Sequence, residues 1–483
     1  MSRTIGIDFG TTNSAAAFVE GSEPRIIPND RGNRLTPSVV GVTADGDTLV
    51  GEAAKNQAVV NAARTVLQVK RRMGSEELIH LGDRGYTPQE IAAEILGKIR
   101  RDAEAYLGHE IEDAVITVPA HFTDLQRRST QEAGRLAGLR VRRVINEPTA
   151  AALAYGQRLE ETANIVVYDL GGGTFDVTCL RKEGSVFTVK ASTGAFRLGG
   201  MDFDREMLDG VLETFRAEYG VDLSSDPALL QQLSELTEKA KIELSSQQSA
   251  LLALPFVGSG TAFHMQQELR RSGFESAIES MVERTIALTR EAIQEAGWNV
   301  SEIDNLVLAG GSTRIPLVRR RLDEAIGCDF ESKVNPDEIV ALGAAVEAER
   351  LRGGRDGTVL KDVTPYALGV EIEGRGYVSV IGRNAQLPAE GRKVFTTVAD
   401  NQRSVEIHVL QGDSHTAGAN VSLGRFLLTG IRPAKQGTPR IEVRFRLDED
   451  GIAHVRARDV DTGSQEYISV APVPTDEESD AAG

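Results

Sequence analysis

Two short glycine-bearing segments contain the residues of this chain that could do chemistry. The first is IGIDFGTTNS at residues 5–14, and the second is VYDLGGGTFD at residues 167–176. In each, an apolar run ends in aspartate and is followed by glycine, hydroxyl side chains and another apolar run. The two aspartates, Asp8 and Asp169, stand 161 residues apart (169 − 8). The pattern predicts the same strand, tight turn and strand twice in one chain.

The residue types in these turns are suited to binding a polyphosphate. Glycine has no Cβ, so backbone N–H groups at Gly10 and at 171–173 can approach phosphate oxygens closely. Thr11, Thr12 and Thr174 add hydroxyl donors. Two aspartates placed side by side would repel each other unless a cation lay between them, and Mg²⁺ bridges carboxylates to phosphates. Either segment alone could be a plain hairpin turn, but the pair favours a nucleotide cleft.

Composition excludes several other classes of function. The chain has 483 residues, of which 41% are hydrophobic and 26% charged, which is typical of a globular protein with an ample core. The net charge of −17 argues against nucleic-acid binding. There is neither a signal-peptide pattern nor an apolar run long enough to cross a bilayer. Two cysteines, Cys179 and Cys328, fit a reducing compartment, so we expect a cytoplasmic protein with no membrane contact.

The elements that must hold the two turns follow an α/β pattern up to about residue 353. Residues 115–118 read as a strand, and Thr123 with Gln126 forms a capping-box pattern at the start of a helix. Glu147-Pro148-Thr149 opens a second, alanine-rich helix. Between 274 and 297 a buried helical face is predicted from the spacing of Phe274, Ile278, Met281, Thr285, Leu288, Ala292 and Ala296.

The pattern changes near residue 350. Residues 352–357 are polar and glycine-rich, which indicates a linker. Beyond Asp362 apolar residues alternate with polar ones, as at 405–409 and 441–447, and this predicts an antiparallel β-sandwich. We therefore expect domains at 1–353 and 363–473, an interdomain linker at 354–362 and a disordered acidic tail at 474–483.

A dozen ordered motifs make the chain similar to the seventy-kilodalton heat-shock family, the DnaK-type chaperones. Besides the two glycine segments they include ITVPAHF, INEPTAAALAYG, RLGGMDFD, EKAKIELSS, LVLAGGSTRIP, DVTPYALGVEI and DEDGIAHVRARD. The resemblance implies an α/β actin-like ATPase domain, a duplicated ribonuclease-H-like fold, followed by an all-β sandwich peptide-binding domain. It also implies slow ATP hydrolysis by in-line attack of water.

The resemblance assigns roles residue by residue. Asp8 and Asp169 would hold Mg²⁺ through waters, with K⁺ as a further candidate ion. Catalysis would fall to Lys70, Glu147, Asp169, Thr174 and Asp176. ATP or ADP would be held by Gly10, Thr11, Thr12, Asn13, Gly171, Gly172, Gly173, Gly199, Gly200, Glu238, Lys241, Ser245, Gly310, Gly311, Ser312, Arg314 and Asp337. Pro119 and Arg127 would relay nucleotide state between the domains.

Several of these residues have an ordinary structural interpretation without the resemblance. Lys70 would be one member of the basic surface run at 70–72. Glu238, Lys241 and Ser245 would form one solvated helix face. Asp337 would be a carboxylate in the first turn of a helix.

Three departures from the family pattern carry further expectations. We expect no helical lid over the peptide groove, so peptide should leave quickly. Lys361 places a hydrated charge in the linker, which predicts weaker coupling between domains. The groove would be lined by Val370, Phe395, Val398, Val405 and Ile407, and Glu373 at its rim predicts a preference for basic residues flanking the bound peptide.

The function predicted is that of an ATP-dependent molecular chaperone, an ATPase that controls binding of extended apolar peptide segments. Its partners would be unfolded clients, a J-domain co-chaperone and a nucleotide exchange factor. Two alternatives stay open at this point: a nucleotide-gated binder of one dedicated partner, and a small-molecule kinase of the actin-like superfamily.

Overall fold

Each glycine-bearing segment joins two antiparallel strands, and each pair lies inside a larger sheet. A computed structural model describes residues 4–156, 159–220, 222–224, 226–257, 263–327, 334–353 and 357–469. The first sheet has the order β11-β10-β1-β2-β3, with a short β4 added to β2. Its strands are β1 (Ile5–Asp8), β2 (Asn13–Glu20), β3 (Glu23–Ile27), β4 (Thr36–Pro37), β10 (Asp113–Val118) and β11 (Arg140–Asn146).

The second sheet repeats this plan. Its order is β17-β12-β13-β14-β18, from β12 (Thr162–Leu170), β13 (Phe175–Glu183), β14 (Val186–Ala195), β17 (Asn305–Ala309) and β18 (Val359–Lys361). In both sheets the strand that ends at the glycine turn pairs in parallel with one neighbour, β10 or β17, and antiparallel with the strand after the turn. The predicted strand, turn and strand is therefore present twice, within four strands whose order and direction agree, β10-β1-β2-β3 and β17-β12-β13-β14. The fifth strands, β11 and β18, lie at opposite edges.

Two helices pack between the sheets, while α2 and α3 lie on the outer face of the first sheet and α7 on that of the second. The inner pair is α9, against β1, β2 and β10, and α4, against β12 and β13. They approach closely at Gly343, where an added Cβ would lie 1.7 Å from the Ala150 carbonyl oxygen. The helices are α1 (Glu52–Ala58), α2 (Pro88–Leu107), α3 (Asp124–Leu136), α4 (Glu147–Gly156), α5 (Gly200–Tyr219), α6 (Pro227–Leu244), α7 (Arg271–Glu295), α8 (Pro316–Ile326) and α9 (Ile339–Leu351).

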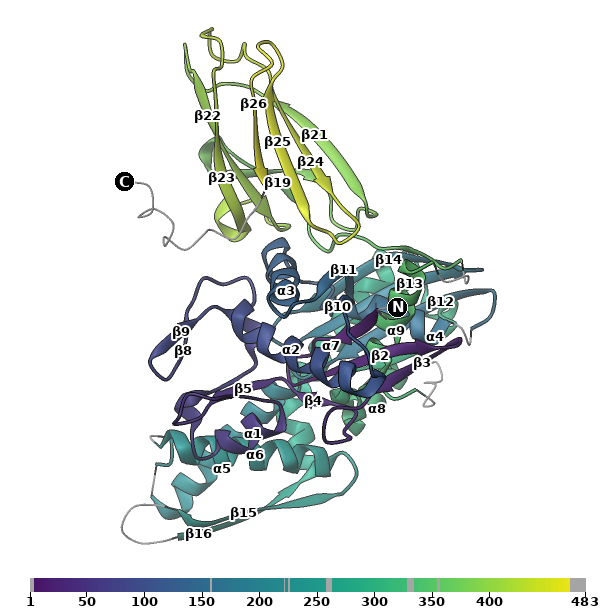
Figure 1. Cartoon of the computed structure of the whole chain (residues 1–483), viewed down its shortest axis with the longest axis vertical. Coiled ribbons are helices and arrows are strands. Elements are labelled where there is room, and N and C mark those ends of the chain that lie inside the picture. Colours follow the sequence, from purple (N-terminus) through teal and green to yellow (C-terminus); the bar gives the residue numbers. More distant parts are fainter. Residues whose placement is uncertain are drawn as a thin grey trace.

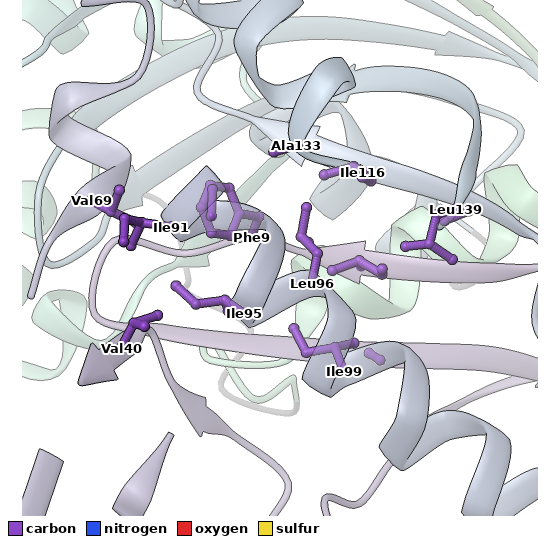
Figure 2. Close-up of a cluster of buried hydrophobic side chains, with 14 of the residues drawn as sticks. Phe9, Val40, Val69, Ile91, Ile95, Leu96, Ile99, Ile116, Ala133 and Leu139 are labelled. Carbon is purple, nitrogen blue, oxygen red and sulfur yellow. The ribbon is translucent and has the colours of Figure 1, made fainter. Parts of the chain in front are cut away.

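The outer faces supply most of the core. Figure 2 shows the cluster between α2 and the first sheet, in which Ile91, Ile95, Leu96 and Ile99 of the helix face Phe9 and Ile116. Apolar residues three and four apart make one face of α2, and burying that face fixes the helix on the sheet. Phe9 directly follows Asp8, so this core also anchors the first glycine turn.

Short elements extend the two halves. The hairpin β15-β16 lies at the end farthest from the C-terminal strands, and the hairpin β8-β9 lies to one side of α2 (Figure 1). The short elements comprise the sheet β6-β5-β7, the hairpin β8-β9 and the hairpin β15-β16. Their bounds are β5 (Val39–Val42), β6 (Thr48–Val50), β7 (Thr65–Leu67), β8 (Ile79–Leu81), β9 (Arg84–Tyr86), β15 (Ser249–Val257) and β16 (Phe263–Arg270). The 3₁₀ turns are η1 (Ala62–Arg64), η2 (Val69–Arg72), η3 (Val300–Glu302), η4 (Gly311–Arg314), η5 (Glu373–Arg375) and η6 (Ala417–Ala419).

The C-terminal part consists of two four-stranded antiparallel sheets that share one apolar core. The first has the order β20-β19-β22-β23 and the second β21-β24-β25-β26. The strands are β19 (Leu368–Ile372), β20 (Gly376–Ile381), β21 (Ala389–Phe395), β22 (Ser404–Gln411), β23 (Val421–Thr429), β24 (Ile441–Leu447), β25 (Ala453–Asp459) and β26 (Gln465–Ser469). In β24 the apolar residues are buried and the charged ones are not, which is the alternation that the sequence predicts.

The segment expected to be a linker is partly a strand. Val359–Lys361 pairs in parallel with β14, so the connection extends the second sheet. Within it Leu360 packs on the core while Lys361 is exposed. The lysine is therefore exposed in this arrangement, and weaker coupling between the domains stays a prediction.

The C-terminal sheets contact α3 directly, as Figure 1 shows. The backbone N–H of Ala453 donates to Asp124 at 2.6 Å, and Arg128 donates to the Ala453 carbonyl at 2.6 Å. The side-chain oxygen of Gln411 accepts from the backbone of Asp124. These contacts fix the two parts of the chain against each other.

Two details of the sequence analysis are refined by the structure. The helix predicted from 274 to 297 runs from Arg271 to Glu295, and its buried face uses Val282, Ile286 and Ile293, with Met281 and Leu288 only partly buried. Cys179 is buried on β13, whereas Cys328 and the acidic tail lie outside the described residues.

Among the described helices none is long and apolar enough to span a membrane.

Candidate functional site

The two glycine turns face each other across a cleft. A Cβ added to Gly172 would lie 2.1 Å from the Thr12 hydroxyl, and one added to Gly173 would lie 2.6 Å from the Thr11 hydroxyl. Glycine at these two positions is therefore required by close approach of the opposite turn. The backbone N–H groups and hydroxyls of both halves converge on the same space.

The cleft encloses a cavity of about 100 Å³ between the two turns. Most of the residues predicted for phosphate, metal and catalysis line it. They are Asp8, Gly10, Thr11, Thr12, Asn13, Lys70, Glu147, Asp169, Gly171, Gly172, Gly173, Thr174, Gly310, Gly311 and Asp337. Leu35, Pro336 and Val340 complete the lining and were not predicted.

Three carboxylates and one ammonium group form the centre of the cleft. Glu147 and Asp169 are buried, whereas Asp8 is half-buried. Lys70, only 3% exposed, forms an ion pair with Glu147. Burial raises the pKa of Glu147 to about 7, against the opposing effect of Lys70. Burial, and then the charges of Glu147, Asp176 and Asp8, raise the pKa of Asp169 well above its usual range. Burial likewise raises the pKa of Asp8. Negative charge is therefore in excess here.

Such a set of oxygen ligands suits a hard cation that would relieve the repulsion. Within the part of the chain that the structure describes, however, no three His, Cys, Asp or Glu side chains are spaced to hold a metal ion directly. A role for Asp8 and Asp169 through bound water fits both observations and stays a prediction.

A second group of predicted residues contacts the backbone of the second glycine turn. The backbone N–H of Gly200 and the Ser312 hydroxyl each donate to the Gly171 carbonyl at 3.0 Å. A Cβ on Gly199 would lie 2.7 Å from the Gly172 carbonyl oxygen. Gly199, Gly200 and Ser312 thus set the shape of the second turn.

The three predicted residues of α6 have different environments. Glu238 lines a second hollow that shares Thr11 and Thr12 with the cleft, and it pairs with Lys55 of α1 at 2.9 Å. Lys241 donates to Asp204 at 2.7 Å and to the Gly200 carbonyl at 2.9 Å. The Ser245 hydroxyl donates to the Lys241 carbonyl at the end of its own helix. Lys55 was not predicted as a site residue, because it belongs to none of the motifs recognised in the sequence.

Arg314 is oriented by two partners. It donates to Asn335 and to Asp337, both at 2.7 Å. Its side chain is 47% exposed, so the guanidinium plane remains accessible beside the cleft. A fixed, accessible guanidinium is able to stack on a planar ring.

Asp176 differs from the other predicted catalytic residues, since it is 1% exposed and does not appear among the residues that line the cleft. It is the strand partner of Asp169, and its carboxylate accepts from His121 at 2.7 Å. Arg71, interpreted in the sequence as part of a basic surface run, donates to the Gly173 carbonyl at 2.7 Å and to Asp202 at 2.6 Å. It therefore links η2 of the first half to the second turn.

Pro119 and Arg127 lie between the cleft and the C-terminal sheets. The Pro119 carbonyl accepts from the backbone of Phe122. Arg127 donates to Asn146 at 2.6 Å, to the Ala120 carbonyl at 3.0 Å and to the Asp450 carbonyl at 3.4 Å. One side chain thus contacts β11, the loop after β10 and the turn between β24 and β25.

The predicted groove residues come together in the C-terminal part. Val370, Phe395, Val398, Val405 and Ile407 line one hollow, and Glu373 lies at it as well. Further charged side chains at the same hollow are Glu371, Glu406, His408 and Arg425. The hollow is therefore lined by apolar side chains and by charged side chains of both signs.

The fold and the cleft define a two-lobed, nucleotide-binding type of protein, and comparison with known proteins gives the family. The family model described as Hsp70 protein matches residues 4–80 and 76–482. Two relatives, both named Chaperone protein DnaK and from two strains of Halobacterium salinarum, are 49% identical over 471 residues, covering 97% of this chain and 75% of theirs. The chain belongs to the Hsp70 family, and the resemblance is confirmed.

Proposed function

We propose that this chain is an ATP-dependent molecular chaperone that hydrolyses ATP to control its binding of extended apolar peptide segments. The observation that carries the proposal is the continuous connection between the two sites. The strand β18 pairs with the sheet that holds the second glycine turn, and the same segment leads into the sheet that lines the apolar groove. Nucleotide state can therefore bias the arrangement of the groove.

In the proposed cleft the backbone N–H groups and hydroxyls of both turns bind the phosphates. Lys70, held by Glu147, contacts the terminal phosphate and orients the attacking water. Thr174 lies beside the terminal phosphate. Asp176, on β13, also positions the attacking water. Magnesium, held through waters by Asp8 and Asp169, would neutralise phosphate charge. Arg314 stacks on the base and Glu238 closes the nucleoside side.

Coupling to the C-terminal part runs through buried polar contacts. Asp362, at the end of β18, accepts from Asn146 at 2.9 Å and from Thr149 at 3.0 Å. Both donors belong to the segment that also carries Glu147 of the cleft. A change at Glu147 can therefore alter how firmly the linker is held.

We assign residues 1–353 to the ATPase unit, 354–362 to the linker and 363–473 to a β-sandwich that binds peptide. Val370, Phe395, Val398, Val405 and Ile407 would receive an apolar side chain of the client. Glu373 and its acidic neighbours would favour lysine or arginine beside it. A J-domain co-chaperone and a nucleotide exchange factor are the partners that such a cycle requires.

Peptide affinity measured on the full chain with ATP and with ADP tests the proposal. Labelled peptides with an apolar centre and basic flanks would be titrated with both nucleotides and magnesium present. The proposal predicts at least about tenfold weaker binding with ATP, which corresponds to about 1.4 kcal/mol of coupling. Equal affinities would leave an ATPase without control of peptide binding.

A further inference from the structure

His121 lies between Asp176, one of the predicted catalytic residues, and Tyr366 of the C-terminal part. It lies in the loop 119–123, between β10 and α3, and is 7% exposed. The motif ITVPAHF contains it, but no role was predicted for it. Its ring contacts two groups that belong to different parts of the chain.

On one side His121 holds the carboxylate of Asp176. Its ring Nδ1 lies 2.7 Å from Asp176 Oδ1, and its backbone N–H donates to the same oxygen at 3.3 Å. Two contacts on one oxygen fix the plane of the carboxylate. Gly194 of β14 leaves the space for this pair, because a Cβ there would lie 2.8 Å from Nδ1 and 3.0 Å from Oδ1.

On the other side the His121 ring meets Tyr366. The two rings are 5.7 Å apart between centroids and nearly perpendicular at 86°, the edge-to-face arrangement that aromatic rings favour. Tyr366 lies between β18 and β19, at the entrance to the C-terminal sheets. Burial, followed by the charge of Asp176, raises the pKa of Tyr366 to about 12, so the phenol remains neutral beside the pair.

The loop that carries His121 is itself held in place. Arg127 donates to the carbonyls of Ala120 and Phe122, on either side of His121. The same guanidinium donates to the Asp450 carbonyl of the C-terminal part. Undocking of that part would therefore remove both Tyr366 and one restraint on the loop.

We propose that His121 is a positioning residue that sets the Asp176 carboxylate for ATP hydrolysis, and that Tyr366 sets His121 only while the two parts are docked. The proposal rests on the proposed function, since it assumes that Asp176 orients the attacking water. It adds a connection from the C-terminal part to that carboxylate through the His121 ring, beside the contacts that Arg127 makes. A purely structural His–Asp pair would stabilise the fold without affecting the chemical step selectively.

Steady-state and single-turnover hydrolysis by the full chain test this. His121→Phe keeps an aromatic ring for Tyr366 but loses the donor to Asp176, and His121→Gln keeps a side-chain donor. Losing one hydrogen bond to a charged group should lower kcat about ten- to a hundred-fold in His121→Phe with KM for ATP changed less than twofold. His121→Gln should recover part of that loss, because its amide can still donate.

Tyr366→Leu supplies the second arm. It should alter kcat in the otherwise unchanged chain and have no further effect in the His121→Phe background, because the contact acts only through the ring donor. A thermal melt and ADP titration on each variant verify folding, and His121→Gln carries the test if the phenylalanine variant does not fold.

Three results would overturn the inference, each at a different level. A wild-type chain that hydrolyses ATP together with an equally fast His121→Phe variant would remove the role of His121 and leave the proposed function standing. Equal effects of Tyr366→Leu in both backgrounds would remove the dependence on docking. A wild-type chain that neither binds nor hydrolyses ATP would overturn the proposed function and this inference together.

Discussion

Replacing Lys70 by alanine should separate nucleotide binding from hydrolysis. The change removes the ammonium group that pairs with Glu147 in a cluster of three carboxylates, two of them buried. Breaking a buried ion pair costs about 3–5 kcal/mol when the remaining charge stays ionised. If the contact of Lys70 with the terminal phosphate stabilises the transition state by a similar free energy, its loss lowers the rate of hydrolysis by at least about 100-fold. This follows from 1.36 kcal/mol for each factor of ten in rate.

The effect on stability should be smaller than the effect on rate. The pKa of Glu147 is raised to about 7 even though Lys70 lowers it, so removing Lys70 raises it further. At neutral pH the variant's Glu147 then binds a proton and leaves no unpaired charge. A raised carboxylate pKa favours the folded state at low pH, so the variant's stability should fall as pH rises through and above 7.

The assay is single-turnover hydrolysis of labelled ATP beside calorimetric titration with ADP. Lys70→Ala should hydrolyse at least about 100-fold more slowly and bind ADP within about threefold of the wild type, because the glycine turns still hold the phosphates. Lys98→Ala is the matched control, since Lys98 also pairs with two carboxylates, Asp30 and Asp102, but lies outside the cleft. Hydrolysis by Lys70→Ala within threefold of the wild type would refute the reasoning.

Three further predictions concern the mouth of the cleft, the docked contact and the groove. Lys55→Ala removes the half-exposed pair with Glu238 at the second hollow beside the cleft, worth about 1 kcal/mol at most, so stopped-flow release of labelled ADP should be up to about fivefold faster. Burial and then Asp448 raise the pKa of Asp450 to about 6, so docking should strengthen as pH falls through 6 and weaken above it, as measured by energy transfer between dyes on the two parts. Asp450→Asn should flatten this dependence without removing it, since burial also raises the pKa of Asp124 at the same contact. Glu373→Met should reduce the preference for basic flanking residues on a peptide array, and an unchanged array profile would argue against a role for this carboxylate.

Local patterns in the sequence were sufficient to predict the two glycine turns and the strands around them. Asp8 and Asp169 each end an apolar run, and the geometry of a strand followed by a glycine turn leaves little choice of structure. The capping box at Thr123 likewise predicts the start of α3, which the structure confirms. These features depend on residues that are neighbours along the chain.

Pairs formed by residues far apart could not be predicted in the same way. Lys55 and Glu238 are 183 residues apart and meet only because the fold brings α1 and α6 together at the second hollow. Arg71 was grouped with its basic neighbours, although its side chain points to Gly173 in the other half. The contact between His121 and Asp176 depends on the same long-range assembly. In each pair the partner is set by how the two halves pack, which no local spacing encodes.

The parallel pairing of β18 with β14 also has a consequence for aggregation. Residues 359–361 cover Val186, Phe187 and Thr188, which would otherwise be an open sheet edge. Open edges recruit foreign extended chains and seed insoluble assemblies. Each release of β18 from β14 thus exposes a short unpaired sheet edge. The fraction of time that the chain spends undocked therefore sets how often it can self-associate through this edge.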